Sequence, residues 1–310
     1  MSEEPRSNGV ESVEQAVKRC YSTWGESYYR EYYGKDAPYP PVHLQLITSL
    51  VESISPRRLL DAGCGPASML RHLVKPAREV YGFDLTPEMV DEARRILGEL
   101  EVAPQRIWQG SVLDAAAFAC PGETPAPFDA VLCVGVAPHL PEGEECTLLR
   151  NLHQALRPGG TVILEARNEL FSLFTLNRYS HELFLQRLVP VSELRARAGE
   201  EGAGVDNALA QLSSMFRTDL PPIRKGKQDE PGYDEVVSRL HNPLVLARQF
   251  ANSGFTDVRT LFYHFHSLPP MLSQHAPRVF LETSLQMEHD PLDWRGYFMA
   301  SAFLVVATRA

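Results

Sequence analysis

The sequence lacks any excess of positive charge. Its 310 residues carry 30 Lys+Arg against 39 Asp+Glu, a formal net charge of −9. The one compact basic cluster, Arg224, Lys225 and Lys227, is followed at once by Asp229 and Glu230. Because a protein that follows nucleic-acid phosphates needs a broad basic surface, we expect no nucleic-acid partner.

Cysteines are few and unpaired, and long apolar runs are absent. The five cysteines (Cys20, Cys64, Cys120, Cys133 and Cys146) are odd in number and include no Cys-x-x-Cys pair, so a disulfide framework is not indicated. No stretch approaches the ~20 apolar residues of a membrane span, and residues 2–15 lack the pattern of a signal peptide. These absences predict a cytoplasmic protein with reduced thiols and no membrane partner.

The composition that remains is that of a globular protein. Hydrophobic residues make up 44% and charged residues 22% of the chain, so general disorder is not expected. A chain of 310 residues fits one large domain or a domain with a substantial insertion.

Short apolar segments alternate with amphipathic ones between residues 58 and 166. The segments with strand character are Arg58–Ala62, Val80–Asp84, Arg106–Gly110, Ala130–Val134 and Thr161–Ala166. Those with helical periodicity are Ser68–Lys75, Pro87–Leu100 and Glu144–Leu156, the last stopped by Arg157-Pro158-Gly159-Gly160. Strict alternation predicts a parallel sheet with helices on both faces.

The flanking regions have a different pattern. Aromatic residues from Tyr21 to Tyr33 recur at spacings of three and four, which predicts an amphipathic helix that either packs on the core or forms a lid, and a second helix is expected from His43 to Ser53. Residues 168–241 show only helical patterns and are predicted to be a cap insertion. A further helix at 243–253 precedes two strands near 257–265 and 298–307. We therefore predict four parts: a lid (1–50), a core (51–167), a cap (168–241) and a C-terminal part of the core (242–310), with a doubly wound α/β sheet of seven strands.

The strand at Arg58–Ala62 runs into a glycine turn, Asp61-Ala62-Gly63-Cys64-Gly65. Gly63 and Gly65 leave room where the backbone turns sharply and a ligand approaches. Asp84 ends the next strand, 19 residues after Gly65. An acid at that place can accept both hydroxyls of a ribose.

Two details separate this turn from a dinucleotide site. Ser68 stands where the third glycine of Gly-x-Gly-x-x-Gly would be. Asp61, beside the turn, would repel a pyrophosphate but would attract an ammonium or sulfonium group. The pattern therefore favours a cationic nucleoside ligand.

With these features, residues 57–167 resemble the Rossmann-like core of the class I S-adenosylmethionine-dependent methyltransferases. The resemblance implies a methyltransferase with S-adenosylmethionine as cofactor. It implies that Asp61, Gly63 and Gly65 line the methionine part, that Asp84 holds the ribose and that Leu85 flanks the adenine. In the family an acid often meets the adenine amino group at the position of Ser111. Besides these, the residues expected around the cofactor are Cys64, Gly110, Val112 and Val134.

The segment after the fourth strand indicates the acceptor class. Methyltransferases that act on nitrogens of nucleic acids and proteins often carry an Asn/Asp-Pro-Pro-aromatic motif there, whereas this chain has Gly135-Val136-Ala137-Pro138-His139. This resembles the small-molecule branch, with a natural-product or sugar-type acceptor. We predict that His139 is catalytic and lies near the transferred methyl; a packing histidine is the alternative.

Acceptor contacts are predicted from four places in the sequence. The candidates are Tyr28 and Tyr33 in the aromatic segment, Arg167, Asn168 and Tyr179 after the fifth strand, His241, and the pair His264 and His266. His264 and His266 have the spacing of a strand and would lie on the same face of it. Such a pair could bind a metal, contact the substrate or be structural. Without a placeable third ligand, no metal is predicted.

Two rival functions remain. An aminopropyl-type transferase would share the fold, but an acid pair expected after the fourth strand is missing. A non-catalytic partner protein that retains the cofactor pocket is the second rival. The oligomeric state is left open, with a homodimer among the options.

Overall fold

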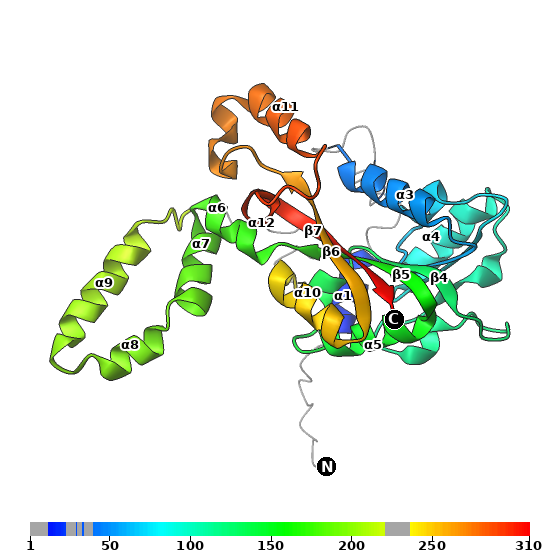
Figure 1. The fold of residues 1–310 in the computed structure, drawn as a ribbon, viewed down its shortest axis with the longest axis horizontal. Coiled ribbons are helices and arrows are strands. Elements are labelled where there is room, and N and C mark those ends of the chain that lie inside the picture. Colours follow the sequence, from blue (N-terminus) through cyan, green and yellow to red (C-terminus); the bar gives the residue numbers. More distant parts are fainter. Residues whose placement is uncertain (1–11, 23–28, 30–32, 34–39, 221–235) are drawn as a thin grey trace, which may run out of the picture.

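A seven-stranded sheet forms the centre of the protein (Figure 1). The computed structural model describes residues 12–22, 29, 33, 40–220 and 236–310. The strand order is β3-β2-β1-β4-β5-β7-β6. The strands are β1 (Arg58–Ala62), β2 (Glu79–Asp84), β3 (Ile107–Gln109), β4 (Phe128–Cys133), β5 (Leu156–Arg167), β6 (Phe255–Phe265) and β7 (Ala300–Arg309).

The sheet is mixed, and its five strands between residues 58 and 167 are parallel, as predicted. β1 to β5 pair in parallel, but β7 inserts between β5 and β6 and is antiparallel to both. β7 begins where β6 ends, with Phe265 opposite Ala300. After β6 the chain therefore turns back, and β7 runs antiparallel beside it. An antiparallel neighbour needs no crossover helix between the two strands.

Helices lie on both faces of the sheet, and further helices belong to the insertion after β5 (Figure 1). The helices are α1 (Val13–Tyr21), α3 (Val42–Ile54), α4 (Pro87–Gly98), α5 (Glu145–Ala155), α6 (Ser172–Thr175), α7 (Arg178–Leu183), α8 (Val191–Arg197), α9 (Gly202–Ser214), α10 (Pro243–Asn252), α11 (Pro277–Met287) and α12 (Gly296–Met299). No helix among the residues described is long and apolar enough to cross a membrane.

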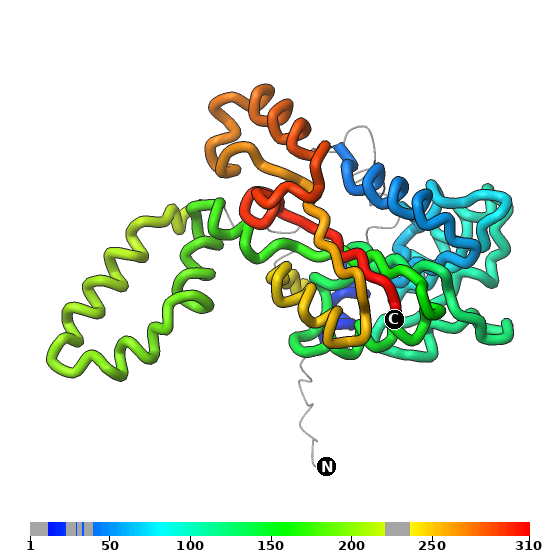
Figure 2. The backbone as a smooth tube through the Cα atoms, viewed as in Figure 1, coloured from blue at the N-terminus to red at the C-terminus, as the bar shows by residue number. Residues whose placement is uncertain are grey.

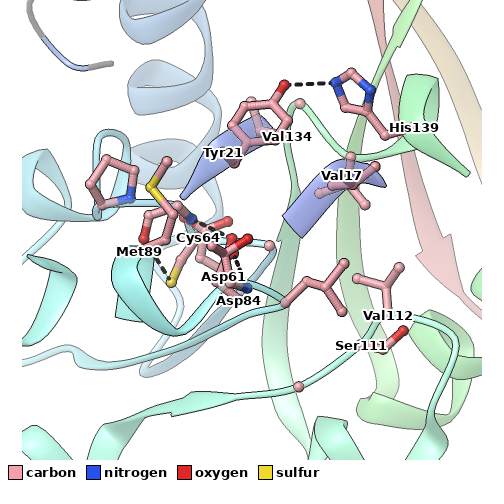
Figure 3. A pocket seen from close by; sticks show the side chains of 18 of the residues that line it. Val17, Tyr21, Asp61, Cys64, Asp84, Met89, Ser111, Val112, Val134 and His139 are labelled. Atoms are coloured by element: carbon pink, nitrogen blue, oxygen red, sulfur yellow. Dashed lines mark hydrogen bonds between the residues drawn. The ribbon is translucent and has the colours of Figure 1, made fainter. Parts of the chain in front are cut away.

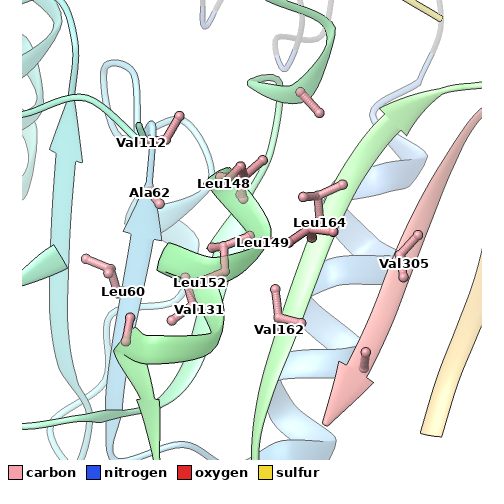
Figure 4. Packing of buried hydrophobic residues seen from close by; sticks show 14 of the residues in the cluster. Leu60, Ala62, Val112, Val131, Leu148, Leu149, Leu152, Val162, Leu164 and Val305 are labelled. Atoms are coloured by element: carbon pink, nitrogen blue, oxygen red, sulfur yellow. The ribbon is translucent and has the colours of Figure 1, made fainter. Parts of the chain in front are cut away.

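Successive residues of the central strands enter opposite hydrophobic cores. Leu60 and Val131 pack with Leu149 of α5 (Figure 4), whereas the neighbouring Leu59 packs with Val51 of α3 in the second core. Side chains alternate across a strand, so strands buried on both faces read as continuous apolar runs. This explains why the strands were predictable from the sequence.

Two predicted features take another form. The helix expected at Ser68–Lys75 is only a 3₁₀ turn, Leu70–His72, because Ala67 adopts a left-handed φ of 56° and Pro76 cannot continue a helix. The Arg157–Gly160 segment ends α5 as expected but lies within β5 as a bulge: Phe128 pairs with Leu156, and Ala130 pairs with Thr161. The helices α11 and α12 were not predicted.

The insertion after β5 is helical, as predicted. Its α8 and α9 pack on each other and extend away from the sheet (Figures 1 and 2), and neither buries a residue. In this structure the α8–α9 pair therefore does not cover the sheet. That the insertion closes on a ligand stays a prediction, and residues 221–235, near its end, lie outside the residues described.

Candidate functional site

A cavity that opens to solvent lies at the carboxyl ends of β1 to β4 (Figure 3). Open α/β sheets bind ligands at this edge, beyond the strand ends. Every residue predicted to surround the cofactor lines this cavity: Asp61, Gly63, Cys64, Gly65, Asp84, Leu85, Gly110, Ser111, Val112 and Val134. His139 and Tyr33 line it as well. The structure therefore brings the sequence motifs to one place.

Asp61 carries the most unusual carboxylate in the cavity. Its side chain at the end of β1 is only 2% exposed, and its Oδ1 has no hydrogen-bond partner among the residues described. Burial, together with the nearby charge of Asp84, raises the pKa of Asp61 to about 7. A cationic group placed here would satisfy the oxygen and offset the repulsion.

The glycine turn shapes the floor of the cavity. Gly63 has a left-handed φ of +87°, and a Cβ there would lie 2.2 Å from Val136 Cγ2. Gly65 has φ +51°, and a Cβ there would meet nothing within 4 Å. Gly63 is thus required by packing, whereas the space at Gly65 is available to a ligand.

Asp84 is oriented by the backbone around it. Its Oδ2 accepts the Gly65 N–H at 2.8 Å, and its Oδ1 accepts the Thr86 N–H at 2.9 Å. Burial nevertheless raises its pKa. Each carboxylate oxygen has a further lone pair, so Asp84 can still accept two hydroxyls.

Beyond Asp84 the cavity becomes an apolar slot. Its walls are Leu85, Met89, Val112 and Leu113. The backbone of Gly110 packs closely against Ala117, since a Cβ at Gly110 would lie 2.7 Å from the Ala117 Cβ. These apolar side chains suit an aromatic ring, and Ser111 supplies a polar atom in the same cavity.

Helix α1 forms the roof; it lies within the predicted N-terminal lid (1–50), but none of its residues was among the predicted site residues. Glu14, Val17 and Tyr21 lie one and two helical turns apart and all line the cavity. The aromatic pattern suggested a helix beginning at Tyr21, whereas α1 ends there. The signal that was available is the capping box of Ser12 and Gln15, in which each side chain accepts the backbone N–H of the other residue.

His139 lies in a 3₁₀ turn after β4 and is 9% exposed. Its Nδ1 lies 2.7 Å from the Val237 carbonyl oxygen, which requires Nδ1–H, so Nε2 accepts the hydroxyl of Tyr21 at 2.8 Å (Figure 3). Burial lowers the pKa of His139 to about 4. The imidazole is therefore neutral and holds the Tyr21 phenol at the cavity wall.

Glu165 braces the loop that carries the cavity wall after β4. Its Oε2 accepts the Gly135 N–H at 2.6 Å, and its Oε1 accepts the hydroxyl of Tyr263. Burial and the charge of Glu165 raise the pKa of Tyr263 well above its ordinary value. Sequence patterns gave no indication of this contact, because Glu165 and Tyr263 are 98 residues apart.

Only one of the predicted acceptor-binding residues lines the cavity. Tyr33 does so and packs against His43, with ring centroids 4.8 Å apart. Tyr28 lies outside the residues described. The others are not among the lining residues: Arg167, Asn168, Tyr179, His241, His264 and His266.

The prediction that Asn168 contacts an acceptor is corrected by its surroundings. Its Nδ2 donates to the carbonyls of Gly296, Tyr297 and Ala300 at 2.8–3.1 Å, and its Oδ1 accepts the Leu170 N–H. A side-chain amide has two donor hydrogens, so this group is fully used. Asn168 joins the end of β5 to the start of β7 and is structural.

The remaining candidates have separate environments. His264 has a left-handed φ of 55° and packs against His43, whereas His266 packs against Phe171. The left-handed residue interrupts the strand alternation on which the same-face prediction depended. His241 is buried, and its Nε2 lies 3.7 Å from Glu145 Oε1. Within the described part of the chain, no group of three or more His, Cys, Asp or Glu side chains could hold a metal.

Tyr179 and Arg167 also lie elsewhere. Tyr179 is 44% exposed on α7 of the insertion, and Arg167 at the end of β5 donates to the Ser238 hydroxyl. A role for either of them in binding the acceptor stays a prediction.

The fold and the cavity define a Rossmann-like α/β protein whose site suits a cationic nucleoside. Residues 59–160 match the family model described as a methyltransferase domain. The chain is 33% identical over 151 residues to the ubiquinone biosynthesis O-methyltransferase of Xanthomonas campestris pv. campestris (strain B100). That match covers 48% of this chain and 59% of the relative, so the chain spans less than two thirds of the relative's length.

Two solved structures have a similar fold. Magnesium protoporphyrin IX methyltransferase from Synechocystis PCC 6803 gives a TM-score of 0.52 at 16% identity and covers 96% of this chain and 100% of its own. Phosphoethanolamine N-methyltransferase 2 of Haemonchus contortus gives a TM-score of 0.51 at 15% sequence identity. The match covers 97% of this chain and 60% of that chain. Residues 59–160 thus match a methyltransferase domain in sequence, and the fold of the chain is similar to that of solved methyltransferases.

Proposed function

We propose that the protein transfers a methyl group from S-adenosylmethionine to an oxygen of a small molecule of natural-product or sugar type. The observation that carries this proposal is Asp61: a buried carboxylate with an unpaired oxygen, next to Asp84, at the edge of the cavity. Two acids side by side raise each other's pKa unless a cation joins them. A cofactor with an ammonium and a sulfonium group meets that need.

The residues present fit this cofactor. Asp61 would accept the ammonium of the methionine part, and Asp84, already fixed by Gly65 and Thr86, would accept the ribose hydroxyls. The apolar slot between Leu85 and Val112 would hold the adenine. When bound, the cofactor supplies a methyl carbon activated by a positively charged sulfur.

The chain's own residues would position the acceptor and exclude water. Glu165 fixes Gly135, so the loop after β4 keeps its shape while the acceptor binds. The phenol of Tyr21, held by His139, is a hydroxyl partner that can orient the acceptor oxygen or pass on its proton. Aligning two bound reactants can contribute on the order of 7–11 kcal/mol to lowering a barrier.

Two further observations support the acceptor class and the compartment. The relative from Xanthomonas campestris is named an O-methyltransferase of ubiquinone biosynthesis, a small-molecule pathway. All five cysteines of this chain are free thiols, as is usual in a reducing cytoplasm.

The test is calorimetry followed by transfer of a labelled methyl group. The purified protein should bind S-adenosylmethionine and S-adenosylhomocysteine at micromolar concentrations and should not bind NAD. Label from S-adenosylmethionine should then appear in members of a panel of phenols, sugars and hydroxylated natural products. Binding of NAD without S-adenosylhomocysteine would refute the cofactor assignment. Cofactor binding with no transfer to any acceptor would favour a non-catalytic partner protein.

A further inference from the structure

Helix α1 brings an acidic side chain into the cavity, next to Ser111. Glu14 lines the cavity, and its Oε1 accepts the Ser111 hydroxyl at 2.5 Å. The two residues are 97 positions apart in the sequence. Ser111 itself is fixed further, since its Oγ also accepts the Leu113 N–H at 3.1 Å.

We infer that Glu14 is a specificity-determining residue for the cofactor: its carboxylate accepts the exocyclic amino group of the adenine, in place of the acid that this chain lacks at Ser111. This inference depends on the proposed function, because it names how the same cavity selects its nucleoside. The acid comes from the roof helix instead of from the strand end.

The shape of the slot supports this role. A ring between Leu85 and Val112 is held by apolar contacts alone, which do not distinguish one purine from another. Discrimination requires a polar group at the rim of the ring. Glu14 and Ser111 form such a polar pair in the same cavity, and Ser111 directly precedes Val112 of the apolar lining.

The chemistry of the carboxylate gives the selectivity. An ionised Glu accepts hydrogen bonds only, and its two oxygens provide about four lone-pair sites. The Ser111 hydroxyl occupies one of them. The carboxylate can therefore accept an N–H of an amino group as well, and it gains nothing from a purine that has hydrogen at that position.

The placement of Glu14 also links the two halves of the site. Glu14 and Tyr21 lie on the same face of α1, seven residues and hence ~10 Å apart at 1.5 Å per residue. Glu14 meets the end of β3 through Ser111, and Tyr21 meets the turn after β4 through His139. One helix thus contacts both the nucleoside end of the cavity and the wall next to the methyl-transfer position.

The test compares two ligands on two proteins by calorimetry. The ligands are S-adenosylhomocysteine and its purine analogue, in which hydrogen replaces the 6-amino group. The wild type should bind the purine analogue at least about tenfold more weakly, the loss of one hydrogen bond to a charged acceptor. Glu14→Gln, whose amide can present either a donor or an acceptor, should bring the two affinities within about threefold of each other, chiefly by weakening S-adenosylhomocysteine.

A matched control separates amine recognition from docking of the helix. Val17→Ala removes an apolar contact of the same helix with the cavity. This variant should weaken the binding of both ligands by the same factor, so the ratio of the two affinities should stay at the wild-type value. Melting curves of the free proteins establish that each variant is folded.

The outcomes are distinguishable. An equal affinity of the wild type for the two ligands, or an unchanged ratio in folded Glu14→Gln, overturns the role of Glu14 while the proposed function stands. A wild type that binds neither ligand overturns the proposed function itself. If Val17→Ala bound the two ligands with similar affinity, the docking of the helix, and not the Glu14 carboxylate, would set the preference for the amino-bearing ligand.

Discussion

Replacing Asp61 by Asn should have opposite effects on the free protein and on its complex with the cofactor. The change removes the charge of a side chain that is 2% exposed and keeps its shape. The pKa of Asp61 is raised from 3.8 to about 7, so the folded protein holds this proton more tightly than the unfolded chain does. The contribution of Asp61 to stability is therefore greatest at low pH and falls as the pH rises through about 4 to about 7.

The size of this effect follows from the two pKa values. Between pH 5 and pH 8 the wild type should lose roughly 3 kcal/mol of unfolding free energy through Asp61. Asn does not titrate, so Asp61→Asn should gain stability relative to the wild type by about that amount over the same range. Urea unfolding at pH 5, 6, 7 and 8 measures the difference. Asp91→Asn, an exposed change on α4, serves as the control and should show no such pH dependence.

Cofactor affinity should respond in the opposite direction. A cation binds the ionised form of Asp61, which makes up only a small fraction of the free protein at pH 5.5 when the pKa is about 7. Affinity for S-adenosylmethionine should therefore rise about 25-fold between pH 5.5 and pH 7.5, the single-site titration result. Above that range the amino group of the ligand itself begins to lose its proton. Asp61→Asn should bind weakly at every pH.

Other titratable groups also face this cavity, and the variant isolates Asp61 from them. They are Asp84 from β2, Glu14 and Tyr21 from α1, Tyr33, and His139, whose pKa of about 4 keeps it neutral across the range. The reasoning fails if Asp61→Asn and the wild type differ in stability by the same amount at pH 5 and pH 8. It also fails if the variant keeps both the wild-type affinity and its pH profile.

Four further substitutions test the remaining contacts. Asp84→Ala should weaken S-adenosylhomocysteine by roughly ten- to a hundredfold, the value of hydrogen bonds to a charged acceptor, in a chain that stays folded; unchanged affinity in calorimetry would place the ribose elsewhere. Gly63→Ala should lower the unfolding free energy by about 1–3 kcal/mol, because the new Cβ would meet Val136 at a left-handed φ of +87°; wild-type stability in denaturant unfolding would contradict this. His139→Ala should cut methyl transfer at least ~10-fold with cofactor affinity intact, and Tyr21→Phe should do the same if the phenol is the group that meets the acceptor. Since the pKa of His139 is about 4, these losses should be constant between pH 6 and pH 8, and full activity in both variants would remove the pair from the mechanism.

The sequence by itself determined the parts of the site that lie close together along the chain. Asp61, Gly63 and Gly65 follow one strand, and Asp84 ends the next, so the pattern of strand, turn and helix was enough to bring them to one edge of the sheet. The central strands were equally predictable, because burial on both faces makes them continuously apolar. Local order and side-chain periodicity carry this information.

Only the tertiary structure decided what closes the site. The contacts of Glu14 with Ser111 and of Tyr21 with His139 join residues 97 and 118 positions apart. It also placed Asn168 against the start of β7 and away from the cavity, because β7 inserts beside β5 in the antiparallel direction. Neither the packing of α1 over the sheet edge nor the insertion of β7 has a local periodic signal. Both depend on which surfaces bury each other once the chain has folded, which is why the contacts of α1 with the cavity were found only in three dimensions.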